Sequence, residues 1–190
     1  MAGFQPLNIK YREYPPSFEP YELVIERSLE DMQDVFYDQN AVKKTLAKDN
    51  PSIVKVWMAP LPNDDGHLMS CMTVIHPGTI GDEYFMTKGH IHTDPVNDPE
   101  YYLTIRGEGL LLLQTREGES HTSEMVPGTL NYIPSEWAHR TVNTCNDEFV
   151  FLGIFPASAK RDYSFIGVGK KNFNKVVVKH SGKPEVTDHP

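Results

Sequence analysis

From residue 51 onward the sequence is a succession of short β-rich runs separated by turn residues, and this pattern most constrains the fold. The runs are rich in Val, Ile, Thr, Tyr and Phe, and the breaks carry Asn, Asp, Gly and Pro, as in NDDG, RGEG and REGE. Short strands at regular spacing are typical of an antiparallel sandwich or small barrel. The sequence therefore predicts an all-β protein with strands at 52–59, 67–76, 83–92, 100–107, 109–115, 121–126, 129–134, 139–145, 148–155 and 174–180.

The N-terminal part of the chain differs from this pattern. Residues 1–21 are rich in Pro and Tyr and are expected to form an extended arm, which either wraps on the core or reaches a partner subunit. A short strand is predicted at 22–28, and Ser28 and Asp31 are spaced to cap the start of a helix. The apolar spacing that follows predicts one broken helix or two short ones, which end at the sequence DNP, residues 49–51.

These features divide a single structural domain into three parts. Residues 1–50 are the arm, strand and helical segment packed on the barrel, residues 51–180 are the barrel, and residues 181–190 are a tail. A length of 190 residues suits one domain with its own core. The tail, which reads GKPEVTDHP after Ser181, is expected to be frayed.

Composition and charge argue against several classes of protein. A formal net charge of −8 and the lack of a polybasic run argue against nucleic acid as a partner. No apolar run approaches the ~20 residues that span a bilayer, and the N-terminus lacks the apolar segment of a signal peptide. Cys71 and Cys145 are too few for a disulfide scaffold and are expected to be free thiols. We therefore expect a cytoplasmic protein without a membrane partner.

Two histidines, His90 and His92, stand two residues apart in the sequence TKGHIH. Residues i and i+2 of a strand point to the same face, so these imidazoles are expected to lie side by side. Glu100 begins the next predicted strand after the loop TDPVNDP, and pairing of the two strands would place its carboxylate beside the histidines. His and Glu are suitable ligands for a divalent first-row metal, although two solvated histidines beside a loop would give the same pattern.

A third histidine, His139, follows a strand and a turn in the sequence PGTLNYIPSEWAHRTVN. It can supply another imidazole from a different strand. Three histidines and one carboxylate would leave open positions on an octahedral metal for oxygens of a substrate. The other histidines stand alone near turns or termini and are expected to be surface or locally bonded residues: His67, His76, His121, His180 and His189.

The histidines and their neighbours resemble the two motifs of the cupin superfamily. The first motif matches at His90, His92, Glu100 and Gly107. The second motif matches at Pro127, Gly128, Pro134, His139 and Asn143. Two features depart from the general pattern: the loop before Glu100 is longer, and Glu136 stands where the second motif usually has glycine.

Four longer segments point to a subgroup of cupins. The segments FMTKGHIH, GEGLLLLQTREGE, MVPGTLNYIPSEWAHRTVN and FVFLGIFPASAKRDY closely resemble the cupin-type glucose-6-phosphate isomerases, and the resemblance extends over residues 20–180. It implies a cupin jelly-roll β-barrel with an N-terminal arm and one or two short helices. It also implies a homodimer that interconverts glucose 6-phosphate and fructose 6-phosphate with one divalent metal per subunit, Fe(2+) first and Mn, Ni, Co or Zn as alternatives.

The same resemblance assigns roles to individual residues. It places the metal on His90, His92, Glu100 and His139. It places the substrate phosphate near Thr73, Thr87, Lys88, Gly89 and Tyr163, with Arg161 adding positive charge nearby. Tyr102 matches a tyrosine near the sugar, whereas Phe155 stands where archaeal relatives carry a tyrosine.

Two mechanisms remain open for the hydrogen transfer between C1 and C2. Glu100 could act as a base as well as a metal ligand, moving the proton from C2 to C1, with Tyr102 orienting a hydroxyl or relaying a proton. A metal-assisted hydride shift would need no base. Other activities also fit: an iron dioxygenase of the cupin class, an isomerase or epimerase for another sugar phosphate such as mannose 6-phosphate, or a non-catalytic sugar-phosphate sensor.

Overall fold

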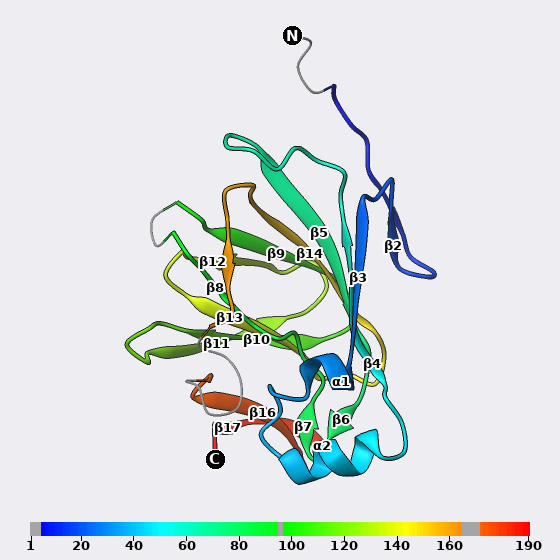
Figure 1. The fold of residues 1–190 in the computed structure, drawn as a ribbon, viewed down its shortest axis with the longest axis vertical. Helices are drawn as coiled ribbons and strands as arrows, with labels where there is room; N and C mark the ends of the chain where they lie inside the picture. The colour runs from blue at the N-terminus through cyan, green and yellow to red at the C-terminus, as the bar shows by residue number, and fades with distance from the viewer. Residues whose placement is uncertain (1–4, 95–96, 165–171) are drawn as a thin grey trace.

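The computed structural model describes residues 5–94, 97–164 and 172–190, which fold mainly into antiparallel strands (Figure 1). The all-β prediction and the short helices are confirmed. The helices lie at one end of the molecule, beside β6 (Thr79–Ile80) and β7 (Glu83–Tyr84). In these described ranges, no helix is long and apolar enough to cross a membrane.

The largest sheet has six antiparallel strands in the order β12-β9-β14-β5-β4-β3. In its middle, Gly153 of β14 pairs with Tyr102 of β9 on one side and Cys71 of β5 on the other. Alternation along β9 buries Glu100, Tyr102 and Thr104 on the face toward the barrel interior. The strands are β3 (Leu23–Ser28), β4 (Ser52–Met58), β5 (Leu68–Ile75), β9 (Glu100–Arg106), β12 (Leu130–Ile133) and β14 (Phe149–Pro156).

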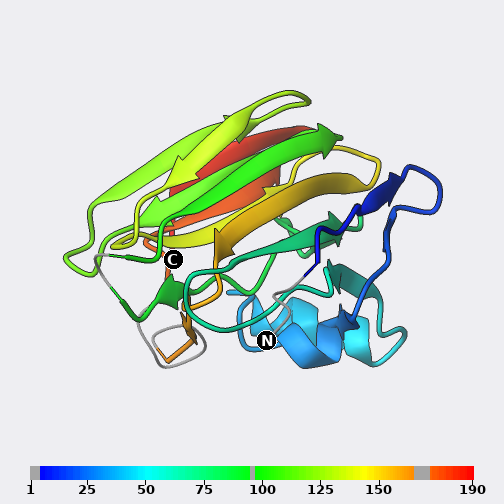
Figure 2. The same cartoon turned by 90° about the horizontal axis from the view of Figure 1, so that it is seen from above.

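Smaller sheets form the other side of the barrel. β10 lies between β11 and β13, β15 pairs with β8, and β17, β16, β7 and β6 form a four-stranded sheet. Figure 2 shows the blue and cyan helices on one side of the molecule and the lime strands of these smaller sheets on the other. The remaining strands are β8 (Ile91–His92), β10 (Gly109–Gln114), β11 (Ser120–Met125), β13 (Ala138–Asn143), β15 (Arg161–Asp162), β16 (Lys175–His180) and β17 (Lys183–Asp188).

Two short helices, α1 (Leu29–Met32) and α2 (Gln39–Leu46), follow β3. The predicted cap is present, because the backbone N–H of Ser28 donates to the Asp31 carboxylate at 2.8 Å. Leu29 and Met32 are fully buried in the main apolar cluster, which also contains side chains from both sides of the barrel. Burial of a side chain of this size stabilises a fold by roughly 1.5–3 kcal/mol, so the helical segment is part of the core.

The described part of the N-terminal arm packs on its own subunit. β1 (Lys10–Arg12) and β2 (Ser17–Glu19) form a small hairpin. Phe18 of β2 is buried in a second apolar cluster with Met72 and Val74 of β5 and Val150 of β14. Of the two arrangements expected for the arm, this contact favours wrapping on the core.

Two predictions about strands are wrong. Residues 83–92 are not one strand, because β7 and β8 are separated by a segment in which Gly89 has φ +77°, a conformation that breaks a ladder. The tail is not frayed, because β17 pairs with β16 along its whole length. Ser181 and Gly182, both with positive φ, form the tight turn between these strands, which is the usual conformation of a two-residue hairpin.

Candidate metal centre

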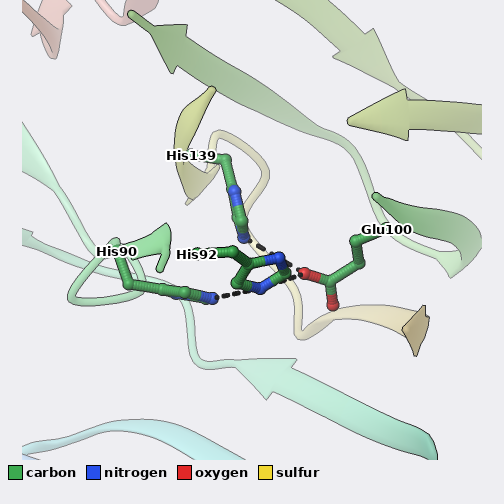
Figure 3. A group of neighbouring side chains, drawn as sticks. All are labelled: His90, His92, Glu100 and His139. Carbon is green, nitrogen blue, oxygen red and sulfur yellow. Dashed lines mark hydrogen bonds and ion pairs between the residues drawn. The ribbon is translucent and has the colours of Figure 1, made fainter. Parts of the chain in front are cut away.

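Four side chains suited to binding a metal converge inside the barrel: His90, His92, Glu100 and His139 (Figure 3). Their ligand atoms all lie within 4.8 Å of one another, and all four side chains are buried. Figure 3 shows the imidazoles and the carboxylate pointing toward a common centre from separate parts of the chain. In the described residues no second group of this kind is found. The other histidines do not join the cluster, as the sequence predicted.

Backbone hydrogen bonds join the two histidine-bearing segments. The N–H of His139 donates to the carbonyl of His90 at 2.9 Å, and the N–H of His90 donates back at 3.2 Å. The predicted pairing of His90 and His92 with the strand of Glu100 is therefore wrong. Glu100 comes from the six-stranded sheet, where β9 pairs with β12 and β14, and it reaches the histidines across the barrel interior.

Backbone carbonyls fix which nitrogen two of the imidazoles present. His92 Nδ1 lies 2.6 Å from the carbonyl oxygen of Asp98, and His139 Nδ1 lies 3.2 Å from that of Trp137. A carbonyl only accepts, so each Nδ1 carries the hydrogen and each Nε2 keeps its lone pair. Metal-binding histidines are commonly oriented in this way by a partner on the second nitrogen.

The polar atoms at the centre fit a divalent cation. His139 Nε2 lies 3.2 Å and His92 Nε2 lies 3.5 Å from Oε2 of Glu100, and His90 Nε2 lies 3.3 Å from His92 Nε2. Adjacent ligand atoms around one metal ion are about 3 Å apart, so only a small contraction is needed. His139 Nε2 and both Glu100 oxygens are buried without a hydrogen-bond partner among the described residues, which is costly unless a cation compensates.

Burial also sets the protonation of the histidines. It lowers the pKa of His90 well below its ordinary value, and it lowers the pKa of His92. Both rings are therefore neutral near pH 7, which is the form that binds a metal.

Gly153 makes room for the carboxylate on β14. A Cβ at this position would lie 3.1 Å from Oε1 of Glu100, 3.1 Å from Cys71 Sγ and 3.2 Å from Cε1 of Tyr102. These contacts are tighter than ordinary van der Waals contact, so the side chains of β9 and β5 depend on a glycine in the strand between them. Both cysteines of the chain are free thiols, as predicted.

A small cavity lies against the centre on the side of His90. Its volume is about 60 Å³, less than the ~300–1,000 Å³ of ordinary ligand pockets, so a hexose phosphate can enter only if lining side chains move. Every residue predicted to contact phosphate lines it, together with Tyr102: Thr73, Thr87, Lys88, Gly89 and Tyr163. Burial raises the pKa of Tyr102 well above its ordinary value, so its hydroxyl stays protonated and can donate.

Two of the predicted phosphate residues have additional structural roles. The ammonium of Lys88 lies 3.8 Å from the carboxylate of Asp34, so its charge is already partly compensated. Gly89 has a positive φ, and a Cβ there would lie 2.8 Å from the ring of Phe173. The glycine is thus required by the turn that leads into His90 as well as by any close approach of a ligand.

The structure adds Arg27 to the lining of the cavity, which also includes Arg161. The alternation of β3 gave no reason to single out Arg27, because half-buried and exposed positions are mixed along that strand. Its neighbour across the cavity is Tyr163, whose ring centroid lies 6.0 Å from the Arg27 guanidinium carbon. Only the packing of the N-terminal strand against the barrel brings this charge to the site.

Comparisons with known proteins place this chain in a family. The family profile described as glucose-6-phosphate isomerase (GPI) matches residues 26–185. The glucose-6-phosphate isomerase of Thermococcus litoralis is 43% identical over 164 residues, which are 86% of this chain and 85% of that protein. The glucose-6-phosphate isomerase of Pyrococcus abyssi is 37% identical over 186 residues, which are 98% of this chain and 96% of that protein.

Solved structures with a similar fold match a smaller share of the chain. Oxalate decarboxylase of Bacillus subtilis, with Mn(II) centres, has a TM-score of 0.45 and 23% identity over 56% of this chain and 26% of that chain. An oxalate oxidase in complex with the substrate analogue glycolate has a TM-score of 0.43 and 14% identity over 51% and 46% of the two chains. On the match of the family profile and of relatives along most of their length, this chain belongs to the glucose-6-phosphate isomerase (GPI) family.

Proposed function

We propose that this protein is a metal-dependent isomerase that interconverts glucose 6-phosphate and fructose 6-phosphate. The observation that carries the proposal is a buried group of three imidazoles and one carboxylate in a chain of the glucose-6-phosphate isomerase family. Within the described residues, His139 Nε2 and both oxygens of Glu100 have no hydrogen-bond partner. The adjoining cavity, lined by hydroxyl groups and cationic side chains, supports a phosphorylated substrate.

His90, His92, Glu100 and His139 would hold one divalent cation per subunit, with Fe(2+) as the first candidate and Mn, Ni, Co or Zn as alternatives. Imidazole and carboxylate ligands accept all of these ions, and the geometry favours none of them. When bound, the cation supplies Lewis-acid stabilisation of negative charge that develops on the substrate oxygens at C1 and C2.

The chain's own groups would move the proton. Glu100 directs Oε2 to two of the histidines, whereas Oε1 lies against the backbone of Gly153 and near Tyr102 and is not engaged by a histidine. In the proposed mechanism Glu100 takes the proton from C2 and returns it to C1. Tyr102, protonated at neutral pH, donates a hydrogen bond to a substrate oxygen. A hydride shift from C2 to C1 would leave Glu100 with the role of ligand alone.

The phosphate group would lie at the opposite end of the cavity from Glu100, where Thr73, Thr87, Gly89 and Tyr163 supply short polar groups. The Thr87 hydroxyl already accepts a hydrogen bond from the N–H of Thr141 at 3.0 Å, and its own hydrogen remains available to a phosphate oxygen. Lys88 would contribute less than its charge suggests, because Asp34 compensates part of it.

We also propose a cytoplasmic homodimer. Leu68, Leu130 and Tyr132 of the six-stranded sheet are each more than half exposed, and Tyr101 and Tyr132 pack against each other on that sheet with ring centroids 5.1 Å apart. Exposed apolar side chains in a group favour an interface. Sedimentation analysis of the wild type and of Leu130→Asp tests it: a dimer that dissociates in the variant is expected, and a wild-type monomer contradicts the proposal.

The decisive experiment is a coupled isomerase assay on metal-free protein reloaded separately with Fe, Mn, Ni, Co or Zn. Glucose 6-phosphate should be converted under anaerobic conditions with at least one metal and not by the metal-free protein. A requirement for oxygen would favour a dioxygenase. Faster conversion of mannose 6-phosphate than of glucose 6-phosphate would identify mannose 6-phosphate as the preferred substrate. Tight binding of glucose 6-phosphate without turnover by any metal form would identify a sensor and overturn the proposal.

A further inference from the structure

Two arginines, Arg27 and Arg161, line the cavity beside the candidate metal centre, and neither guanidinium forms a hydrogen bond or ion pair in the described part of the chain. Arg27 comes from β3 of the large sheet, and Arg161 comes from β15, which pairs with β8. Both side chains are half-buried. A guanidinium that is partly removed from water without an anionic partner is unfavourable, so two of them in one cavity indicate a binding site for an anion.

Each arginine is positioned by an aromatic ring. The guanidinium carbon of Arg161 lies 4.8 Å from the centroid of Phe155, close enough for a cation–π contact. The guanidinium carbon of Arg27 lies 6.0 Å from the centroid of Tyr163, at the outer limit of such a contact. Tyr163 in turn packs on His90, with ring centroids 5.6 Å apart. The ring of Tyr163 thus lies beside both Arg27 and His90.

The other cation of the cavity differs from this pair. Lys88 lies 3.8 Å from Asp34, which compensates part of its charge. Among the described residues no carboxylate lies within ion-pair distance of the Arg161 guanidinium, and burial by itself lowers the pKa of this group. The net positive charge offered to a ligand thus comes from Arg27 and Arg161.

We propose that Arg27 and Arg161 form a two-guanidinium clamp that binds the dianionic phosphate of the sugar phosphate, with Phe155 as the platform that orients Arg161. The proposal rests on the proposed function for the identity of the substrate. A phosphate monoester carries a charge close to −2 at neutral pH, and two arginines match it in charge and in hydrogen-bonding geometry. Thr73 and Thr87 then supply directional hydrogen bonds rather than charge.

The clamp also gives Phe155 a role. A phenyl ring cannot donate a hydrogen bond to phosphate, but its face can pack against a guanidinium, and the planar guanidinium keeps its N–H donors free at its edge. Phe155 is buried in one apolar cluster with Met69 and Cys71 of the neighbouring strand, which holds the ring in place. The clamp should therefore prefer a dianion to a monoanion, which distinguishes it from a site built of hydroxyls alone.

Direct binding tests the clamp independently of catalysis. Calorimetric titration of inorganic phosphate at pH 8 into metal-free protein should give a dissociation constant that rises about tenfold to a hundredfold in Arg27→Met and in Arg161→Met. Phe155→Leu should weaken binding by a smaller factor, and Arg161→Lys should recover part of the loss. Arg116→Met is the matched control, because Arg116 pairs with Asp162 on the same strand as Arg161 but does not line this cavity.

Kinetics on metal-loaded protein supply the second measurement. KM for glucose 6-phosphate should rise in Arg27→Met and Arg161→Met by factors similar to the loss of phosphate binding, with kcat changed only a few-fold, because the clamp acts far from C1 and C2. The monoanionic analogue glucose 6-sulfate should bind more weakly than glucose 6-phosphate to the wild type, and this preference should shrink in the variants.

The outcomes separate the clamp from the proposed function. Unchanged phosphate affinity in both Met variants, with circular dichroism showing native folding, overturns the clamp even if the enzyme is an active isomerase. Arginine-dependent phosphate binding in a protein that isomerises no sugar phosphate supports the clamp and overturns the proposed function. Arg27 is half-buried on β3, so Arg27→Met keeps the test valid if the Arg161 variant fails to fold.

Discussion

At the scale of single residues, the position of Glu100 fits the two roles proposed for its carboxylate, metal ligand and base. Its Oε2 lies within 3.5 Å of two imidazole nitrogens, and its Oε1 is buried beside Gly153. The carboxylate is packed against a glycine on the neighbouring strand, Gly153, and close to Tyr102, which is two residues further along β9 on the same face. The chemistry of the site therefore depends on packing as much as on the identity of the ligands.

Replacement of Glu100 by Gln should reduce turnover of glucose 6-phosphate by about 10²–10⁴-fold, because the amide is neither a base nor a good ligand. The coupled assay measures the rate, and metal analysis after dialysis measures retention of the cation. Glu108→Gln, at an exposed position in the turn after β9, is the control and should behave as wild type. A Glu100→Gln protein with near-native turnover would show that the carboxylate is dispensable.

At the scale of elements, Glu83 of β7 links the helical segment to the barrel. The N–H of Tyr37, between α1 and α2, donates to Oε2 of Glu83 at 2.9 Å, and the carboxyl group is almost fully buried. Burial raises the pKa of Glu83 to about 7. The folded protein therefore binds this proton more tightly than the unfolded chain, so the contribution of Glu83 to stability is full below about pH 4.5 and is lost as pH rises through about 7.

Glu83→Gln should remove this pH dependence while keeping an acceptor for Tyr37. Between pH 5 and pH 8 the wild type should lose the contribution of Glu83, whereas the variant has none to lose. The free energy of unfolding of the variant minus that of wild type should therefore rise over this range, by on the order of 1–3 kcal/mol. Urea titrations at both pH values with a chelator present measure the difference. Glu119→Gln, an exposed carboxyl on the opposite side, is the control. An unchanged difference across this pH range contradicts the assignment.

The C-terminal hairpin gives a second prediction at this scale. Six residues of β17 pair with β16, whose Val176 and Val177 are buried. Removal of residues 183–190 breaks this ladder, and each hydrogen bond contributes about 0.5–1.5 kcal/mol net, so the free energy of unfolding should fall by on the order of 2–4 kcal/mol. Removal of residues 189–190 alone leaves β17 intact and should have a much smaller effect. Thermal unfolding of both truncations decides whether the tail is structural.

At the scale of the whole molecule, the metal centre connects the two sides of the barrel. His139 belongs to β13 and is fastened to His90 by backbone hydrogen bonds, whereas Glu100 belongs to the six-stranded sheet. A cation held by all of these residues would cross-link the two walls from inside. Because a ligand that binds only the folded state stabilises it, the cation should contribute to stability as well as to chemistry.

Chelation should therefore lower Tm and abolish isomerase activity together, and both should return when the metal is restored. A free metal concentration a hundredfold above the dissociation constant corresponds to about 2.7 kcal/mol of stabilisation. In His139→Ala, which lacks one ligand, Tm should respond much less to the chelator, which separates specific binding from general effects of the reagent. A wild-type Tm that is indifferent to chelation would count against a metal at this centre.

The sequence alone determined the class of fold and the residues of the centre. Periodic β-rich runs, the spacing of His90 and His92, and the second motif around His139 are local features, so they can be recognised without knowledge of the tertiary structure. The helix cap at Ser28 is also local and is confirmed. The hairpin at Ser181 and Gly182 had a turn signal, but the polar residues of the tail obscured it because β17 is largely exposed.

Only the tertiary structure decided how these parts meet. Glu100 approaches the histidines across the barrel rather than from a neighbouring strand, because β9 pairs with β12 and β14. Arg27 lines the cavity because β3 is the edge strand of the six-stranded sheet that also contains β9. It is more than a hundred residues away from Arg161 in the chain. Strand pairing and the closure of a barrel depend on contacts between distant segments, and no local pattern of residues specifies them.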